Sequence, residues 1–165
     1  GPDGRIYPGT CRGRSRDSAL PGDALRLDLS RALPSESLFF TETGPKHAGR
    51  YRVDAEHLLT RIGDPVIARP NLPAAYHLAV VLDDAAQSVT EVIRGEDLFE
   101  ATFLHRYLQA LLGLPTPVYH HHSLIRDAAG KRLAKRDDAR ASAKFREDGA
   151  TPGDIRKMVG LTPAA

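Results

Sequence analysis

Residues 76–84 are the stretch of this chain that most constrains its fold. Seven almost continuously apolar positions, 76–82, are followed by two carboxylates, Asp83 and Asp84. A run of this kind is typical of a strand covered on both faces, as in a parallel sheet. The stretch therefore predicts an α/β domain in which the two carboxylates lie at the end of a buried strand.

The segments that follow have the pattern of a nucleotide-binding sheet. Residues 89–94 predict a second short strand, and residues 97–112 predict a helix because leucines recur at three- and four-residue spacing. Gly113 follows this helix and stops it. Residues 119–125 predict a third strand. The order strand, strand, helix, strand is that of part of a Rossmann-like sheet.

The rest of the chain is predicted in less detail. Residues 1–24 are rich in Gly, Pro, Arg and Ser and predict loop. Residues 25–31 alternate apolar and polar side chains, as in a half-buried strand. Residues 64–69 predict a strand entered through proline. Residues 137–160 predict helix, with a break at positions 149–153.

Composition sets broad limits on the class of protein. The 165 residues suffice for one ordinary domain or two small lobes. The 23 basic and 21 acidic residues nearly balance, so net charge argues neither for nor against a nucleic-acid partner. A single cysteine excludes an intrachain disulfide framework and favours a reducing, cytoplasmic location. No apolar run is long enough to span a bilayer, and the N-terminus has no signal-peptide pattern.

Two groups of residues carry candidate chemistry. Arg94 ends the second predicted strand, and its guanidinium can match a carboxylate; Tyr76 begins the first, and its hydroxyl can position a substrate. Lys135 lies in a cationic loop, residues 130–136, suited to phosphates. Together they suggest activation of an amino acid by a nucleotide. Without the resemblance described next, Tyr76 is interpreted as a core tyrosine and Arg94 as a surface salt-bridge residue, and a solvated basic turn is the alternative for the loop.

Five segments resemble, in order and spacing, the second half of the catalytic core of class I glutamyl-tRNA synthetases. They are residues 64–69, 76–84, 93–98, 112–117 and 130–136. The resemblance is closest to the shortened branch of that family, the glutamyl-Q-tRNA(Asp) synthetases, which lack an anticodon-binding domain. Residues 7–11 resemble the second half of the zinc motif of this branch, and the chain ends shortly after the lysine loop.

The resemblance implies an architecture and an activity. Residues 1–68 would be the remainder of an acceptor-binding and zinc-binding insertion, residues 69–127 the second half of a Rossmann-like core, and residues 128–165 the lysine loop with C-terminal helices. ATP, with Mg²⁺, would activate glutamate, which is then transferred to the queuosine base of tRNA(Asp). The complete protein is expected to be a monomer, with no membrane partner.

The resemblance also assigns roles to residues. Tyr76 and Arg94 would bind glutamate. The lysine loop resembles the Lys-Met-Ser-Lys-Ser signature, and Lys135 would be the catalytic residue that stabilises charge on the leaving phosphates. Ala134 and Arg136 stand where the signature has serines. The expected ATP-binding loop comprises Arg132, Leu133, Ala134, Lys135 and Arg136.

Two departures from the family pattern limit these expectations. The chain has no segment like the ATP-binding His-Ile-Gly-His motif, so it resembles a synthetase without its first half and is expected to be catalytically incomplete alone. Tyr7 and Cys11 match two of four zinc ligands, and the Cys-x-Cys half is absent. Two ligands cannot close a tetrahedral zinc site, so Zn²⁺ is expected only in the complete protein.

Two more features leave alternatives open. His120, His121 and His122 lie in a predicted strand, where neighbouring side chains point to opposite faces, so all three cannot converge on one metal ion. A basic stripe, Arg12, Arg14 and Arg16, fits RNA phosphates only by way of the resemblance. The alternatives to the modifying enzyme are an ordinary glutamyl-tRNA synthetase fragment and a non-catalytic remnant that binds RNA or nucleotide.

Overall fold

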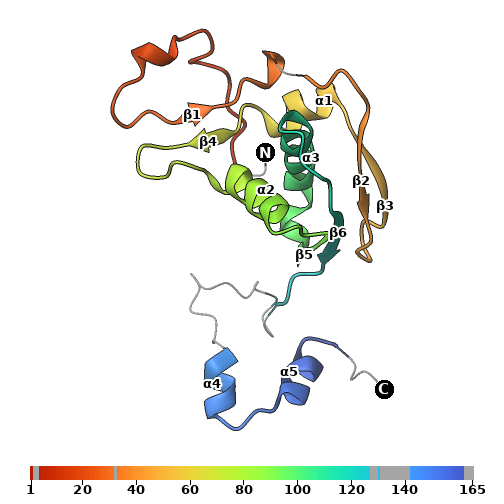
Figure 1. The fold of residues 1–165 in the computed structure, drawn as a ribbon. Coiled ribbons are helices and arrows are strands. Elements are labelled where there is room, and N and C mark those ends of the chain that lie inside the picture. Colours follow the sequence, from red (N-terminus) through yellow and green to blue (C-terminus); the bar gives the residue numbers. More distant parts are fainter. Residues whose placement is uncertain (2–3, 32, 127–129, 131–141, 162–165) are drawn as a thin grey trace. The chain divides into compact units, whose positions relative to one another are not determined.

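The computed structural model describes residues 1, 4–31, 33–126, 130 and 142–161. The chain comprises two compact units, residues 1–122 and 123–165. In the first unit, helices α2 and α3 lie side by side next to a four-stranded sheet (Figure 1). The α/β class predicted from the sequence is confirmed.

The four-stranded sheet has the order β3-β2-β6-β5. Its strands are β2 (Leu38–Glu42), β3 (Gly49–Val53), β5 (Glu91–Gly95) and β6 (Val118–His122). β2 and β3 pair antiparallel, whereas β6 runs parallel to both β5 and β2. The register sets Arg94 opposite His121, and Glu42 opposite Tyr119. Three neighbouring strands therefore bring Glu42, His121 and Arg94 to one end of the sheet.

The helices supply most of the core. They are α1 (Ala55–His57), which runs on into the π-turn η3 (Leu58–Ile62), α2 (Tyr76–Ala86), and α3 (Phe99–Leu111), which follows the 3-10 turn η4 (Glu96–Leu98). Phe99, Phe103 and Tyr107 recur at four-residue spacing on α3 and are buried. Phe40 of β2 packs edge-on against Phe103, with ring centroids 5.1 Å apart. Such pairs add to the stabilisation from burial.

A second, two-stranded sheet belongs to the N-terminal part of the same unit. It pairs β1 (Leu25–Arg26) antiparallel with β4 (Val66–Ala68), and the 3-10 turns η1 (Arg16–Ser18) and η2 (Leu29–Arg31) flank β1. Asp64, only 2% exposed, accepts hydrogen bonds from Arg12 and from the backbone of Leu29. A buried carboxylate therefore ties the otherwise exposed N-terminal loop to the body of the unit.

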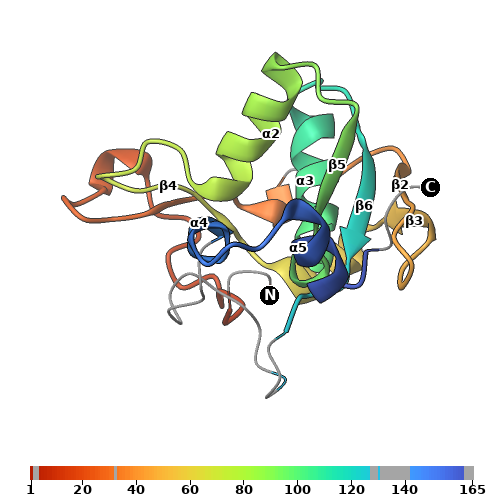
Figure 2. The ribbon, with the colours of Figure 1, turned by 90° about the horizontal axis from the view of Figure 1, so that it is seen from below.

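In the second unit, the described residues form helices α4 (Ser142–Glu147) and α5 (Pro152–Met158), drawn in blue in Figure 2. Thr151 and Asp154 form a capping box at the start of α5. The predicted helical region with a break near Gly149 is confirmed for these residues. Among the described residues of the whole chain, no helix is long and apolar enough to cross a membrane.

The prediction of a buried strand at residues 76–82 was wrong. This stretch is helix α2, which continues through Asp83 and Asp84, so the two carboxylates lie in the last turn of a helix. A short apolar run does not distinguish a buried strand from a buried helix by periodicity. Here Ala79, Ala85 and Ala86 favour helix, and His77 and Val81, one turn apart, supply the buried face.

The predicted strand over residues 25–31 was also wrong beyond its first two residues. Only Leu25–Arg26 is extended, and the chain then turns at η2 (Leu29–Arg31). Leu29 is fully buried in that turn. It therefore accounts for one apolar position of the alternating apolar and polar pattern although the segment is not a strand. Three predicted strands and one predicted helix are confirmed, with ends that differ from the prediction by no more than three residues. They are the strands near residues 64–69, 89–94 and 119–125 and the helix near residues 97–112.

Candidate active site

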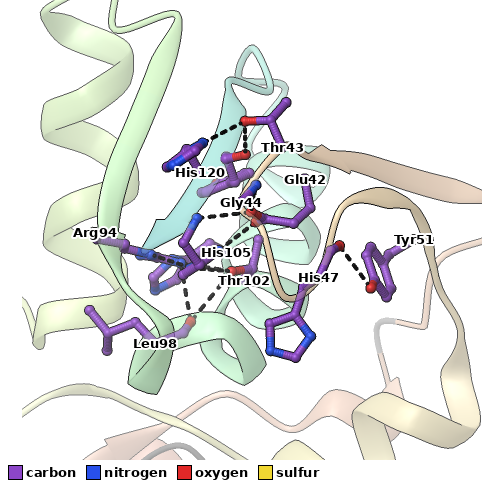
Figure 3. A network of polar contacts seen from close by, with 12 residues as sticks. Glu42, Thr43, Gly44, His47, Tyr51, Arg94, Leu98, Thr102, His105 and His120 are labelled. Atoms are coloured by element: carbon purple, nitrogen blue, oxygen red, sulfur yellow. Dashed lines mark hydrogen bonds and ion pairs between the residues drawn. The ribbon is translucent and has the colours of Figure 1, made fainter. Parts of the chain in front are cut away.

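Arg94 lies at the centre of the candidate site. It comes from the end of β5 and points toward η4 and α3, where the carbonyl of Leu98 and the side chains of Thr102 and His105 face it (Figure 3). Its Nε donates to His121 Nε2 at 3.0 Å. The parallel pairing of β5 with β6 places His121 beside Arg94, since the two residues are register partners.

The Arg94 guanidinium has four of its five N–H groups committed to partners. Besides the bond to His121, Nη1 donates to His105 Nδ1 at 3.0 Å, and Nη2 donates to Thr102 Oγ1 at 2.8 Å and to the Leu98 carbonyl at 3.3 Å. By count over the described residues, the fifth N–H, on Nη1, is the one left for the side-chain hydrogen bond with Tyr76. The side chain is therefore held in one orientation with little freedom.

The Glu42 carboxylate contacts the ring nitrogen of His121 that does not face Arg94. Its carboxylate, 2% exposed, accepts hydrogen bonds at Oε1 from the backbone of Gly44 at 2.6 Å and of His121 at 2.8 Å, and at Oε2 from His121 Nδ1. Burial raises the pKa of Glu42, but the hydrogen bonds from His121 and Gly44 outweigh burial and the pKa is lowered. Glu42 is therefore ionised.

These contacts define the protonated nitrogen of each histidine. An arginine can only donate, so His121 Nε2 must be unprotonated, and the ring proton lies on Nδ1, facing Glu42. His105 Nδ1 accepts from Arg94 in the same way, so His105 Nε2–H donates to His77 Nδ1 at 2.8 Å. Both imidazoles bound to Arg94 are neutral acceptors.

The electrostatics agree with this assignment. Burial lowers the pKa of His105 to about 2, and the charge of Arg94 acts in the same direction. Burial, partly offset by Glu42, also lowers the pKa of His121. Burial lowers the pKa of Arg94 as well, while Tyr119, Tyr76 and Asp84 oppose it. Among the described residues, no carboxylate forms an ion pair with Arg94.

The structure brings Tyr76 and Arg94 together, as the proposed glutamate site requires. Tyr76 begins α2, is half-exposed, and makes a side-chain hydrogen bond that raises the pKa of Arg94. Its ring lies 5.3 Å from the ring of His77 and 6.1 Å from that of His105. One half-exposed tyrosine therefore lies beside a guanidinium whose N–H groups are nearly all used. The predicted roles of both residues in glutamate binding stay predictions.

Residues 131–136 of the predicted lysine loop lie outside the described residues. This applies to all five positions assigned to ATP binding, which are Arg132, Leu133, Ala134, Lys135 and Arg136. The catalytic role of Lys135 therefore stays a prediction from the sequence.

Tyr7 and Cys11 do lie together. The Tyr7 hydroxyl accepts a hydrogen bond from the Cys11 backbone at 2.6 Å, and hydrogen bonds from Tyr7 and then Arg14 lower the pKa of the Cys11 thiol. Within the described part of the chain, no group of three or more His, Cys, Asp or Glu side chains is arranged to hold a metal. The described residues therefore do not fit a closed, four-ligand zinc site.

The basic stripe near the N-terminus borders a pocket of about 630 Å³. Two of its arginines are paired with carboxylates: Arg12 with Asp64 at 2.6 Å, and Arg14 with Asp23 at 3.1 Å. The three neighbouring histidines alternate as a strand requires, with His121 buried and His122 exposed. The predicted strand conformation of this segment is confirmed.

Sequence reasoning missed three residues of the network: Glu42, Thr102 and His105. Glu42 carried a usable signal, because residues 38, 40 and 42 share one face of a short strand and the first two are apolar. A carboxylate on a core-facing position needs hydrogen-bond partners. Thr102 and His105 carry no local signal, since a helix face can bury either residue without a functional role.

Known proteins resemble both the sequence and the fold. Residues 45–163 match the protein family described as "tRNA synthetases class I (E and Q), catalytic domain". The chain belongs to this family. Its predicted membership of the class I glutamyl-tRNA synthetases is thus confirmed.

Two relatives carry the same name. The Glutamyl-Q tRNA(Asp) synthetase of Rhodobacter capsulatus is 57% identical over 164 residues, which are 98% of this chain and 58% of that protein. The Glutamyl-Q tRNA(Asp) synthetase of Nocardia farcinica is 40% identical over 95% of this chain and 49% of its own length. The chain therefore spans about half the length of the curated relatives it matches.

A solved synthetase shares the fold. The crystal structure of a glutamate tRNA ligase from Elizabethkingia meningosepticum, in complex with its amino acid, superimposes with a TM-score of 0.62 and 24% identity. The match covers 94% of this chain and 35% of the ligase. The partial class I core that was predicted from the sequence is confirmed by this likeness.

Proposed function

We propose that this chain is part of an enzyme that activates glutamate with ATP and transfers it to the queuosine base of tRNA(Asp), with Arg94 and Tyr76 in the glutamate site. One observation carries the assignment to this site. Among the described residues, the hydrogen-bond acceptors of Arg94 are neutral, so its positive charge is not cancelled by a direct ion pair. An incoming carboxylate is the partner that such a cation lacks.

The contacts also limit how a carboxylate would bind. A fork-like contact with two N–H groups of Arg94 would require one existing partner to leave, because four groups are already committed. A carboxylate instead replaces the Tyr76 oxygen as the acceptor of the fifth N–H, on Nη1, and in turn accepts from the Tyr76 hydroxyl. Two converging donors from different elements, β5 and α2, position one carboxylate of glutamate.

The reaction proposed for the complete protein has two steps. A carboxylate oxygen of glutamate attacks the α-phosphorus of ATP, forming glutamyl-adenylate as pyrophosphate leaves. A hydroxyl of the queuosine base then attacks the activated carbonyl, and AMP leaves. Lys135 would stabilise the charge that develops on the phosphates in the first step. Mg²⁺ would accompany ATP. The names of the two relatives support the acceptor, tRNA(Asp).

We infer the domain roles on the same basis. Residues 1–68 would contribute to an acceptor-binding insertion, residues 69–127 to the core and residues 128–165 to the lysine loop and trailing helices. Tyr7 and Cys11 would contribute half of a zinc site in the complete protein.

The test is glutamate-dependent ATP–pyrophosphate exchange by the protein expressed from its complete reading frame. Lys135→Ala is expected to lower the exchange rate by about 10²–10³-fold, the usual loss for one transition-state charge partner. Lys131→Ala, in the same loop, is the matched control and should retain most of the rate. Equal rates for wild type and Lys135→Ala would refute the role of Lys135.

The acceptor is tested separately. Transfer of labelled glutamate is compared for tRNA(Asp) with queuosine, tRNA(Asp) without queuosine, and tRNA(Glu). Labelling of the first alone supports the modifying enzyme. Labelling of tRNA(Glu) instead would identify an ordinary glutamyl-tRNA synthetase.

A further inference from the structure

We propose that Glu42 and His121 are positioning residues for Arg94. The carboxylate of Glu42 fixes the tautomer of His121, and only that tautomer offers a lone pair to the Arg94 Nε–H. The inference rests on the proposed glutamate site, because it concerns how the substrate-binding arginine is held.

The geometry at Glu42 leaves its carboxylate no other role. Oε1 is occupied by the backbone N–H groups of Gly44 and His121, so Oε2 is the oxygen that faces the imidazole. A carboxylate can only accept, and the His121 nitrogen facing it must therefore carry the proton. A charged acceptor at this position makes that choice strongly favourable.

The backbone at Gly44 lies against both Glu42 and His121. A Cβ atom added at position 44 would overlap the His121 carbonyl oxygen and would approach Glu42 Oε1 to 2.6 Å. A side chain at this position would push the loop after β2 away from β6. The absence of a Cβ therefore allows Glu42 to be seated against the strand that carries His121.

The tautomer matters because of what lies on the other side of the ring. If His121 carried its proton on Nε2, that N–H would face the Nε–H of Arg94 across 3.0 Å. Two donors cannot share a hydrogen bond, so the guanidinium would shift and its Nη1–H groups would move with it. Glu42 therefore acts on Arg94 through one imidazole, without neutralising it directly.

Glu42→Gln is the first test, performed on the full-length protein. Glutamine keeps the size of the side chain and one acceptor oxygen, but its amide N–H₂ faces His121 Nδ1 and favours the opposite tautomer. We expect ¹⁵N NMR of the imidazole nitrogens to show the proton of His121 moving from Nδ1 to Nε2. In the exchange assay, KM for glutamate should rise about tenfold, with a smaller change in kcat and in KM for ATP.

A pair of substitutions at position 121 separates positioning from folding. His121→Gln can place its amide oxygen near the former Nε2 and still accept from Arg94. His121→Asn can place its amide N–H₂ near the former Nδ1, so it satisfies Glu42 but does not reach Arg94. We expect the KM for glutamate to be several-fold lower in His121→Gln than in His121→Asn. Urea unfolding of both variants shows whether they differ in stability as well.

The possible outcomes decide between the alternatives. An unchanged His121 tautomer and an unchanged KM in Glu42→Gln would overturn the proposal, as would equal KM values for the two variants at position 121. If the wild-type protein shows no glutamate-dependent exchange and binds no glutamate, the proposed function fails. In that case the tautomer in Glu42→Gln still shows whether Glu42 sets the hydrogen-bond acceptor for Arg94.

Discussion

Two arginines in the same unit are held in opposite ways. Arg12, in the N-terminal loop, forms a two-point contact with the carboxylate of Asp64 at 2.6 and 2.9 Å. Arg94, at the end of β5, donates instead to two imidazoles, a hydroxyl and a carbonyl. Hydrogen bonding to Asp64 raises the pKa of Arg12, whereas burial lowers that of Arg94.

The difference shows which arginine is suited to an anionic ligand. The charge of Arg12 is cancelled at contact distance, so its main role is to tie a loop to the body of the unit. Among the described residues no carboxylate bonds directly to Arg94, and Glu42 is connected to it only through the imidazole of His121. Desolvation without a direct counter-charge costs stability, and such cost is typical of sites that bind substrate.

The largest expected effect is at Arg94. Arg94→Ala leaves His121, His105 and Thr102 without their donor in a buried region, and we expect the free energy of unfolding to fall by about 3 kcal/mol. Urea unfolding measures this change, and the exchange assay should show loss of activity with glutamate. Arg94→Lys, which keeps the charge but has one donor atom, should be intermediate. A loss under about 1 kcal/mol would mean that the network adds little to stability.

Asp64 should come next. Asp64→Ala removes the acceptor for Arg12 and for the Leu29 backbone at a site that is 2% exposed, and we expect a loss of about 2 kcal/mol. Urea unfolding again gives the magnitude. Hydrogen exchange should locate the effect in the N-terminal loop, and exchange activity per folded molecule should change little. Asp28→Ala removes the longer 3.8 Å contact with Arg12 and two exposed hydrogen bonds from Ser30, and is the control with a smaller loss.

Acid should destabilise the Arg94 network first. The folded protein holds His105 neutral, with a pKa lowered to about 2, amid Arg94, His77 and His121, whereas the unfolded chain protonates it near 6.5. The unfolded state therefore binds more protons below pH 6.5, and stability falls as pH falls. We expect a loss of about 2 kcal/mol between pH 6.5 and pH 5 from this group.

Urea unfolding across that pH range tests the prediction. His105→Asn, which can place its amide oxygen near the former Nδ1 and so keep an acceptor for Arg94, does not titrate and should flatten the slope. The stability of the N-terminal loop should change with pH over a different, lower pH range. A backbone hydrogen bond from Leu20 and the contact with Arg14 lower the pKa of Asp23, so its contribution is lost only as pH falls below its ordinary value of 3.8. A pH slope that is the same in His105→Asn as in the wild type would refute the assignment.

The smallest expected effect is at Arg14. Its ion pair with Asp23 is largely exposed, so Arg14→Ala should leave the unfolding midpoint nearly unchanged. Because Arg14 also lowers the pKa of the Cys11 thiol, the variant should react more slowly with iodoacetamide near neutral pH. Tyr7→Phe, which removes the first cause of the lowered pKa, should slow the reaction at least as much. Faster reaction in either variant would contradict the assignment.

Local patterns predicted much of this fold. The strand that ends in Arg94, the helix that follows it and the strand through His121 were all found from apolar spacing and from Gly113. The family resemblance was carried by short motifs in order and spacing, which survive even when one element is misread. This is why the run at residues 76–84 pointed to the right family although it was interpreted as a strand.

Other features depend on contacts between distant parts of the chain. By its apolar spacing, the run beginning at Tyr76 fits a helix or a strand, and in the structure it packs as a helix against α3. Glu42, Arg94, His105 and His121 come from four separate elements, and no spacing in the sequence relates them. The protonated nitrogen of each histidine follows from the partner on its other side. Sequence motifs therefore revealed the family and the candidate residues. The orientation of the Arg94 side chain and the neutral state of its partners depend on hydrogen bonds between distant parts of the chain.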